Sequence, residues 1–238
     1  MFGAAGCSQQ ATSERENPQA PSGARAAAAV PSTDVRQRGS AAALAGQGEA
    51  DASPTIVFLG DSLTAGLGVA QDLAFPSLVE ERLVSEGVPV HTINAGVSGD
   101  TTAGGLSRLD WLLRQKPDVV VVELGANDGL RALPLGEVRT NLREIVTRAK
   151  ASGAKVLLVG MLIPTNYGPS YSTGFAKIYP ALAKELKVPL VPFLLDGVAG
   201  RPDLNQEDGI HPTAEGHRRL AENVLPYLRE MLGGSPGS

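Results

Sequence analysis

Short apolar runs alternate with helical patterns along most of this chain, and that alternation constrains its fold more than any other feature. The runs are mostly β-branched and bounded by turn residues, which is typical of buried strands. Strands that alternate with helices favour a parallel sheet covered on both faces, an α/β fold built as a three-layer α/β/α sandwich. The expected strands are Thr55–Leu59, Val90–Asn94, Val119–Glu123, Val156–Gly160 and Leu190–Phe193.

Helical patterns lie between these runs, and local signals mark some of their ends. Thr213 is suited to cap the last helix, because a threonine hydroxyl can accept a hydrogen bond from a free N–H of the first turn. Gly153 is a plausible stop after the third helix. The expected helices are Phe75–Glu86, Thr101–Gln115, Leu135–Ser152, Tyr171–Leu186 and Thr213–Leu232.

Composition divides the chain of 238 residues into two parts. Residues 8–53 are rich in Ala, Ser, Gln, Gly and Pro and contain no aromatic residue. Such a stretch buries too little apolar surface to offset the entropy of ordering it. We therefore expect a disordered, low-complexity N-terminal tail over residues 1–53 and one folded domain over residues 54–234.

Charge and hydropathy exclude two classes of protein. A formal net charge of −4 offers no basic surface of the kind that binds nucleic acid. No apolar run approaches the roughly 18 residues that a membrane-spanning helix needs. The single cysteine, Cys7, leaves no internal disulfide framework.

Cys7 also ends a short segment, Ala4–Cys7, that resembles a bacterial lipobox, in which small residues precede a lipidated cysteine. A signal peptide needs a basic start and an apolar stretch, and only Met1–Gly3 precede this box. Two expectations stay open. Either the start of the sequence is missing and the protein is periplasmic or envelope-associated, tethered to a membrane through Cys7, or Cys7 is an ordinary free thiol and the protein is cytoplasmic.

Polar residues suited to catalysis follow several of the expected strands. Ser62 follows the first strand, Gly99 the second and Asn127 the third. Asp208 and His211 lie in the loop after the fifth. Because parallel α/β sheets bind ligands at the carboxyl ends of their strands, all five residues can converge on one edge of the sheet.

These residue types make up the chemistry of a serine hydrolase. A serine hydroxyl is a weak nucleophile unless a base takes its proton and a third group orients that base. The three-residue spacing across a glycine turn lets Asp208 reach Nδ1 of His211, so that Nε2 faces Ser62. The backbone N–H groups of Ser62 and Gly99 and the side-chain amide of Asn127 can stabilise the oxyanion of an acyl transition state.

Each segment taken alone also has a simpler structural explanation. The segment Gly60–Thr64 departs from the Gly-x-Ser-x-Gly elbow of α/β-hydrolases because Thr64 occupies the last position, and a serine after a strand is often a helix cap or turn. The Gly99 segment can be a strand-to-helix turn capped by Asp100 or Thr101, and Asn127–Gly129 an ordinary turn.

The two remaining histidines have no partner with the right spacing in the sequence. A histidine without such a partner is most simply a solvated residue. We expect His91 and His217, the latter on the last helix, to be solvated and to take no part in the chemistry.

The four segments together, in this order, resemble the SGNH hydrolase superfamily, the GDSL esterases and lipases named after Ser, Gly, Asn and His in four blocks. The resemblance runs from about Ile56 to Tyr227. It implies a hydrolase with a catalytic triad and an acyl-enzyme. The family's roles fall on Ser62 as nucleophile, His211 as base, Asp208 as orienter of the base, and the Ser62 N–H, Gly99 N–H and Asn127 amide as oxyanion donors.

The sequences of five segments resemble those of the bacterial branch that contains acyl-CoA thioesterase I, lysophospholipase L1 and arylesterase. This resemblance implies a five-stranded flavodoxin-like sandwich, no metal or organic cofactor, and a small-molecule ester or thioester substrate with a short to medium acyl chain. The oligomeric state cannot be read from the sequence. The segments are Gly60–Gly66, Val97–Thr102, Gly125–Arg131, Pro164–Gly168 and Asp208–Pro212.

Apolar residues beside these segments are candidates for a groove that binds the acyl chain. Each is equally suited to packing in the core, so the sequence does not rank thioester, lysophospholipid, aryl ester and sugar acetate as substrates. The substrate-binding candidates are Leu130, Ile163 and Tyr167, with Leu133 and Phe175 beside them.

Two other functions remain open at this stage. A non-catalytic, envelope-tethered module would use the same pocket to bind acylated or carbohydrate ligands. A metal-dependent phosphoesterase is the enzymatic alternative, because carboxylates with an imidazole suit Mn²⁺ or Zn²⁺, although it gives Ser62 and Asn127 no role. Its ligands would come from Asp61, Asp100, Asp128, Asp208 and His211.

Overall fold

The structure, a computed structural model, describes residues 53–233. The expected tail, apart from residue 53, and the lipobox-like segment at Cys7 lie outside the described residues. Among residues 53–233, no helix combines the length and the apolar character that crossing a membrane requires.

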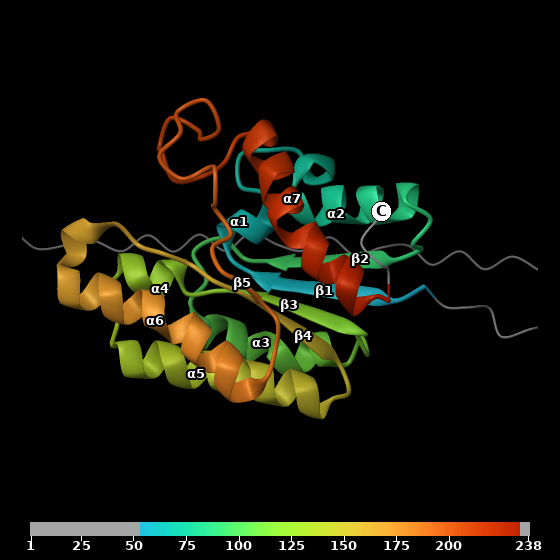
Figure 1. The fold of residues 1–238 in the computed structure, drawn as a ribbon, viewed down its shortest axis with the longest axis horizontal. Helices are drawn as coiled ribbons and strands as arrows, with labels where there is room; N and C mark the ends of the chain where they lie inside the picture. The colour runs from blue at the N-terminus through green and yellow to red at the C-terminus, as the bar shows by residue number, and fades with distance from the viewer. Residues whose placement is uncertain (1–52, 234–238) are drawn as a thin grey trace, which may run out of the picture. The chain divides into compact units, whose positions relative to one another are not determined.

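Five parallel strands form one sheet at the centre of the domain, in the order β2-β1-β3-β4-β5 (Figure 1). This order is that of flavodoxin-like α/β sheets, in which ligands bind beyond the carboxyl ends of the strands. Every pairing is parallel, as the alternation of strands and helices predicts. The strands are β1 (Thr55–Gly60), β2 (His91–Gly96), β3 (Val119–Glu123), β4 (Lys155–Val159) and β5 (Leu190–Val191).

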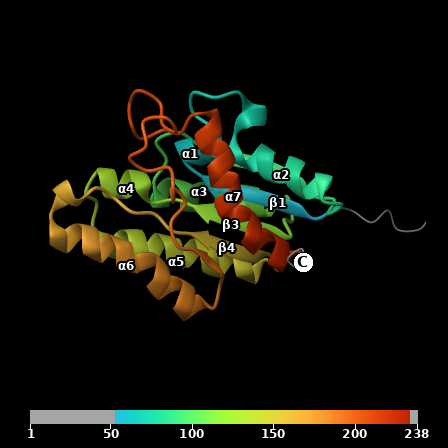
Figure 2. The ribbon, with the colours of Figure 1, turned by 45° about the horizontal axis from the view of Figure 1, so that its top comes forward.

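Helices cover both faces of the sheet, which confirms the predicted three-layer sandwich. Helices α2 and α7 pack together on one face, and α3, α5 and α6 pack side by side on the other (Figures 1 and 2). The five long helices follow the predicted ones closely. The helices are α1 (Ser62–Ala65), α2 (Phe75–Ser85), α3 (Thr102–Leu113), α4 (Ala126–Leu130), α5 (Leu135–Ala151), α6 (Pro169–Leu186) and α7 (Ala214–Met231).

The predicted helix ends are supported by specific hydrogen bonds. The hydroxyl of Thr213 accepts a hydrogen bond from the Gly216 N–H at 3.3 Å and caps α7. Thr101 caps α3 in the same way through the Gly104 N–H at 3.2 Å. Gly153 follows α5 with a φ of 96°, a left-handed conformation that glycine adopts without strain.

His217 is not solvated as the sequence suggested, because α7 turns it inward against α2. Its side chain is fully buried, and its Nδ1 accepts a hydrogen bond from the Phe75 N–H at 3.3 Å. The imidazole also stacks on the Phe75 ring. Burial, with a smaller effect of His211, lowers the pKa of His217 to about 4, so the folded protein keeps this ring neutral. His91, in contrast, is exposed as expected and lies in β2, within the predicted strand Val90–Asn94.

The buried His217 should make the folded state sensitive to acid. Its pKa rises from about 4 in the folded protein to 6.5 when the chain unfolds. Protons therefore bind the unfolded state first as the pH falls through 6.5, and this one group lowers the free energy of unfolding by about 2 kcal/mol between about pH 7 and pH 5.

We expect His217→Asn, whose amide oxygen can still accept from Phe75, to remove that part of the pH dependence even if it lowers stability at about pH 7. Urea unfolding of both proteins at the two pH values measures it. The exposed His91→Asn serves as control and should keep the wild-type difference. An unchanged difference in His217→Asn would show that His217 is not the acid-sensitive group.

Candidate active site

Three side chains from the carboxyl edge of the sheet form one hydrogen-bonded chain. Ser62 begins α1 directly after β1, while Asp208 and His211 lie in the loop between β5 and α7. The Ser62 Oγ lies 2.9 Å from Nε2 of His211. Nδ1 of His211 lies 2.6 Å from Oδ2 of Asp208. The structure thus brings together the nucleophile, base and orienting carboxylate that the sequence predicts.

Local backbone contacts hold Asp208 in place beneath the imidazole. Its Oδ1 accepts hydrogen bonds from the N–H groups of Ile210 and His211, each at 3.0 Å. Gly209 makes the tight turn between them with a φ of 75°. The hydrogen bond from His211, aided by those two N–H groups, lowers the pKa of Asp208 to about 2. Asp208 is therefore ionised at neutral pH, and it favours the tautomer with the proton on Nδ1 and a free lone pair on Nε2.

The turn from β1 into α1 is tight because glycine precedes it. A Cβ on Gly60 would lie 1.9 Å from the Thr64 hydroxyl oxygen, so only glycine allows α1 to fold back this closely. Asp61 caps α1, since its Oδ1 accepts a hydrogen bond from the Leu63 N–H at 3.0 Å. The helix ends at Gly66 with a φ of 75°. This short turn places the hydroxyl of Ser62 beyond the end of the sheet.

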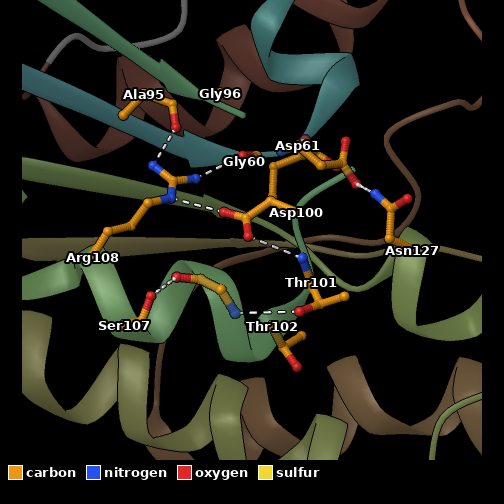
Figure 3. Close-up of polar contacts among 12 residues, drawn as sticks. Gly60, Asp61, Ala95, Gly96, Asp100, Thr101, Thr102, Ser107, Arg108 and Asn127 are labelled. Carbon is orange, nitrogen blue, oxygen red and sulfur yellow. Dashed lines mark hydrogen bonds and ion pairs between the residues drawn. The ribbon is translucent and has the colours of Figure 1, made fainter. Parts of the chain in front are cut away.

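Three hydrogen-bond donors lie beside the serine. The Ser62 N–H is the first of α1 and has no acceptor within the helix, and the Gly99 N–H lies in the turn after β2. Within residues 53–233, neither N–H has a hydrogen-bond acceptor. The side chain of Asn127, in the first turn of α4, donates one N–H to Oδ2 of Asp61 at 3.1 Å (Figure 3). Its other N–H is available to a ligand.

A cavity of about 620 Å³ opens over these residues. Its polar lining residues are Asp61, Ser62, Ser98, Asn127, Asn205 and His211. The rest of its wall is largely apolar and comes mainly from the segments that follow β1, β3, β4 and β5. Its apolar lining includes Leu130, Met161, Ile163, Phe193, Leu195 and Ile210. A largely apolar pocket with a few convergent polar groups is the usual form of a site for an organic substrate.

Comparison with known proteins identifies the family. The model of the GDSL-like Lipase/Acylhydrolase family matches residues 58–219. The chain belongs to this family. Esterase TesA of Pseudomonas aeruginosa is 46% identical over 182 residues, which cover 76% of this chain and 90% of that protein. Arylesterase of Vibrio mimicus is 43% identical, with 76% of this chain and 91% of that protein covered.

Other relatives and solved structures agree. Thioesterase 1/protease 1/lysophospholipase L1 of Escherichia coli is 40% identical over 77% of this chain and 87% of its own length. The crystal structure of TesA superimposes with a TM-score of 0.72 over 74% of this chain and 99% of that chain. AlinE4, an SGNH-hydrolase family esterase, does so with a TM-score of 0.64 at 42% identity, over 81% and 100%. This GDSL-family protein is therefore a carboxylic ester hydrolase, and the SGNH resemblance is confirmed.

The predicted groove residues divide into two groups in this hydrolase. Leu130 and Ile163 line the cavity, whereas Tyr167 does not. The Tyr167 hydroxyl instead donates to the carbonyl of Leu130 at 2.9 Å and so supports a residue that lines the cavity. Neither Leu133 nor Phe175 lines the cavity, and Phe175 is fully buried in the core, the alternative that the sequence left open.

Arg108 is a structural residue of the site that sequence analysis missed. From α3 its guanidinium donates to the carbonyls of Ala95 and Gly60 at 2.6 and 2.9 Å, and to Oδ2 of Asp100 at 2.8 Å (Figure 3). One side chain thus joins the ends of β2 and β1 to the loop that carries Gly99. Its only sequence signal is its place eight residues after Asp100, two helical turns away, where an arginine resembles any solvated helix residue.

The aspartates that a metal-dependent phosphoesterase would need have other partners. Asp100 pairs with Arg108, and Asp128 accepts hydrogen bonds from the backbone N–H and hydroxyl of Thr102 at 2.8 and 2.6 Å. Across the part of the chain that the structure describes, no three His, Cys, Asp or Glu side chains are grouped to hold a metal ion. The ligand set considered from the sequence, which is Asp61, Asp100, Asp128, Asp208 and His211, is therefore not assembled.

Proposed function

We propose that this hydrolase cleaves esters or thioesters through an acyl-enzyme formed on Ser62. The observation that carries this proposal is the hydrogen-bonded chain from Ser62 through His211 to Asp208, at 2.9 and 2.6 Å. Nε2 of His211 takes the hydroxyl proton of Ser62 while Oγ of Ser62 attacks the carbonyl carbon of the substrate. The imidazolium then returns that proton to the departing alcohol or thiol. Water then attacks the acyl-enzyme while His211 takes one of its protons, and His211 gives that proton to Oγ of Ser62 as the carboxylic acid leaves.

In this proposal the oxyanion is held by the Ser62 N–H, the Gly99 N–H and the side-chain amide of Asn127. Their common place at the cavity supports this assignment. Donors fixed in advance stabilise a developing negative charge without the reorganisation that water would need. A non-catalytic binding module would give this triad no purpose, and the esterases among the relatives argue against it.

The cavity favours a substrate with an apolar acyl chain. Of the large apolar side chains that are exposed among the described residues, most lie along this cavity, where they would meet an acyl chain rather than water. The exposed lining residues are Leu67, Leu130, Leu162 and Ile210. The relatives named as arylesterase and as thioesterase and lysophospholipase suggest aryl esters, acyl thioesters and lysophospholipids as substrates to assay. We infer a short to medium acyl chain.

Hydrolysis of p-nitrophenyl esters from acetate to decanoate tests both the activity and the acyl site. We expect turnover that a chelator does not change. Leu162→Trp adds bulk at the cavity wall and should lower kcat/KM for decanoate by about tenfold relative to acetate. Displacing even one methylene of the acyl chain from an apolar pocket costs about that much in kcat/KM.

Val84→Trp is the matched control, because Val84 is about as exposed as Leu162 but lies on α2 and does not line the cavity. It should leave the preference for chain length unchanged. An equal loss for both esters in Leu162→Trp would place the acyl chain elsewhere, and loss of activity with the chelator would favour a metal enzyme.

A periplasmic or envelope-associated location, with a tether through Cys7, stays a prediction from the sequence. Cytoplasmic location is its alternative. Cys7 lies outside the described residues.

A further inference from the structure

Two carboxyl groups beneath the active site have no part in the mechanism above. Asp61 follows the last residue of β1, and Glu123 is the last residue of β3, in register with Gly60. Both side chains are fully buried. A buried carboxylate is costly unless a cation or several hydrogen bonds compensate it. Their neighbours therefore decide in which protonation state this pair exists.

Only one oxygen of Glu123 has donors. Its Oε2 accepts hydrogen bonds from the Thr64 hydroxyl at 2.8 Å and, less closely, from the Asp61 N–H at 3.3 Å. Its Oε1 is buried and, within the described residues, has no hydrogen-bond partner. The Asp61 N–H contact places Glu123 beside Asp61, and each carboxyl group affects the pKa of the other. When two buried carboxyl groups are neighbours, one of them is expected to keep its proton. The Oε1 atom of Glu123, which has no other partner in the described part of the chain, can carry it.

The electrostatics of the pair point the same way. Burial, and then the neighbouring charge of Asp61, raise the pKa of Glu123 well above its ordinary value. Burial raises the pKa of Asp61 to about 6, against the hydrogen bonds that it accepts from Leu63 and Asn127. Near neutral pH the proton therefore belongs on Glu123, and Asp61 is the anion.

Among the residues that the structure describes, no other charged or titratable group replaces this proton. His211, from the loop before α7, acts on Asp61 only through its charge. Tyr179 on α6, itself fully buried, donates its hydroxyl proton to the carbonyl of Leu124. On α3, the guanidinium of Arg108 donates its hydrogen bonds to backbone carbonyls and to Asp100. Within residues 53–233, the carboxyl pair thus has no cation in contact with it.

Asp61 in turn holds the amide of Asn127. Figure 3 shows the side chain of Asn127 turned toward the Asp61 carboxyl, with Nδ2 3.1 Å from Oδ2. Both oxygens of Asp61 accept hydrogen bonds, Oδ1 from the Leu63 N–H and Oδ2 from Asn127, as those of an ionised carboxylate do. The contact fixes the amide so that its nitrogen, not its oxygen, lies next to Asp61, and one N–H remains for a ligand.

We propose that Glu123, protonated, donates a hydrogen bond to the Asp61 carboxylate and thereby keeps Asn127 oriented as an oxyanion donor. Glu123 is a positioning residue in this scheme: it touches no substrate and acts through Asp61. The inference rests on the oxyanion role that the proposed function gives to Asn127, whereas the protonation of Glu123 can be tested without it.

Two substitutions of Glu123 test whether this residue acts as a neutral hydrogen-bond donor or as a negative charge. Glu123→Gln keeps an acceptor for Thr64 and places an N–H where the acid carries its proton, so kcat should stay within about threefold of the wild type. Glu123→Leu removes the donor and should lower kcat by about tenfold or more with little change in KM, because oxyanion donors act in the transition state. Glu80→Gln is the control. Glu80 also accepts from a threonine hydroxyl and N–H, those of Thr92, but lies on α2 away from the cavity.

A double-mutant cycle shows whether the effect passes through Asn127. Asn127→Ala alone should lose about 10²–10³-fold in kcat, as single oxyanion donors do. Adding Glu123→Leu should then cost less than about twofold, because residues that act as one unit are not additive. Full additivity, or a kcat as low in Glu123→Gln as in Glu123→Leu, would overturn the proposal. An Asn127→Ala variant of normal activity would instead refute the oxyanion role.

Infrared spectroscopy reads the proton itself and needs neither activity nor a folded Leu variant. We expect the carbonyl band of a protonated carboxyl group in the wild-type enzyme at about pH 8, and its loss in Glu123→Gln. If the wild type shows no such band, both carboxyl groups are ionised and the proposal fails, whatever the kinetics. If the band is present but survives in Glu123→Gln, the proton is on another residue and the proposal also fails.

Discussion

Ser62→Ala is expected to abolish turnover of p-nitrophenyl esters, with a fall in kcat of about 10⁴–10⁶-fold. The substitution removes the hydroxyl that lies 2.9 Å from Nε2 of His211, and with it the proposed covalent step. Alanine is a good helix former, so α1 should keep its place. The proposed oxyanion donors and the cavity remain, and they should leave only a small residual rate above that of water.

The measurement is kcat for p-nitrophenyl acetate, supported by covalent labelling with an activated phosphonate and mass spectrometry. The wild type should gain one adduct on the peptide that contains Ser62, and Ser62→Ala should gain none. Ser85→Ala is the control, because Ser85 is an exposed serine on α2 whose hydroxyl bonds only to the carbonyl of Arg82. Turnover that persists in Ser62→Ala would show that the nucleophile lies elsewhere.

The fold was predictable because its strands and long helices carry repeating patterns. A run such as Val119–Val122 is buried on both faces and reads as a central strand of a parallel sheet. The two short helices were missed, since Ser62–Ala65 and Ala126–Leu130 each span about one turn and show no periodicity. The burial of His217 was missed for another reason. Its spacing did offer a signal, since Leu220 and Val224 follow it by three and seven residues on the buried face of α7, but a histidine there was expected to be solvated.

The grouping of the candidate site residues was predictable because each follows a strand, and strand ends of a parallel sheet meet at one edge. What the sequence does not carry is the contact between distant side chains. In the sequence Arg108 resembles a surface residue, and only the structure shows its three hydrogen-bond acceptors. Tyr167 resembles a groove residue, but its hydroxyl donates to the carbonyl of Leu130 instead. Glu123 offered a signal that was overlooked: an acidic residue that ends a run of valines must be buried with the strand.

Asp208→Asn should lower kcat by about 10³–10⁴-fold even though asparagine has nearly the same shape. The oxygen of the amide would keep the hydrogen bonds from the Ile210 and His211 N–H groups, which turns its NH₂ toward Nδ1 of His211. Nδ1 must then accept, so the proton moves to Nε2, and the imidazole can no longer take the proton of Ser62. Asp208→Ala, which imposes no tautomer, should be impaired no more than Asp208→Asn.

Asp203→Asn separates this effect from a general loss of negative charge. Asp203 lies in the same loop, is exposed, and pairs with Arg201 rather than with the triad. Its substitution should leave kcat within about twofold of the wild type. Because the pKa of Asp208 is about 2, the carboxylate stays ionised over the whole range of an ester assay, and any acidic fall in wild-type activity must come from another group. An Asp208→Asn enzyme with near-normal kcat would mean that the backbone turn alone fixes the imidazole, and that the carboxylate charge contributes little to the reaction.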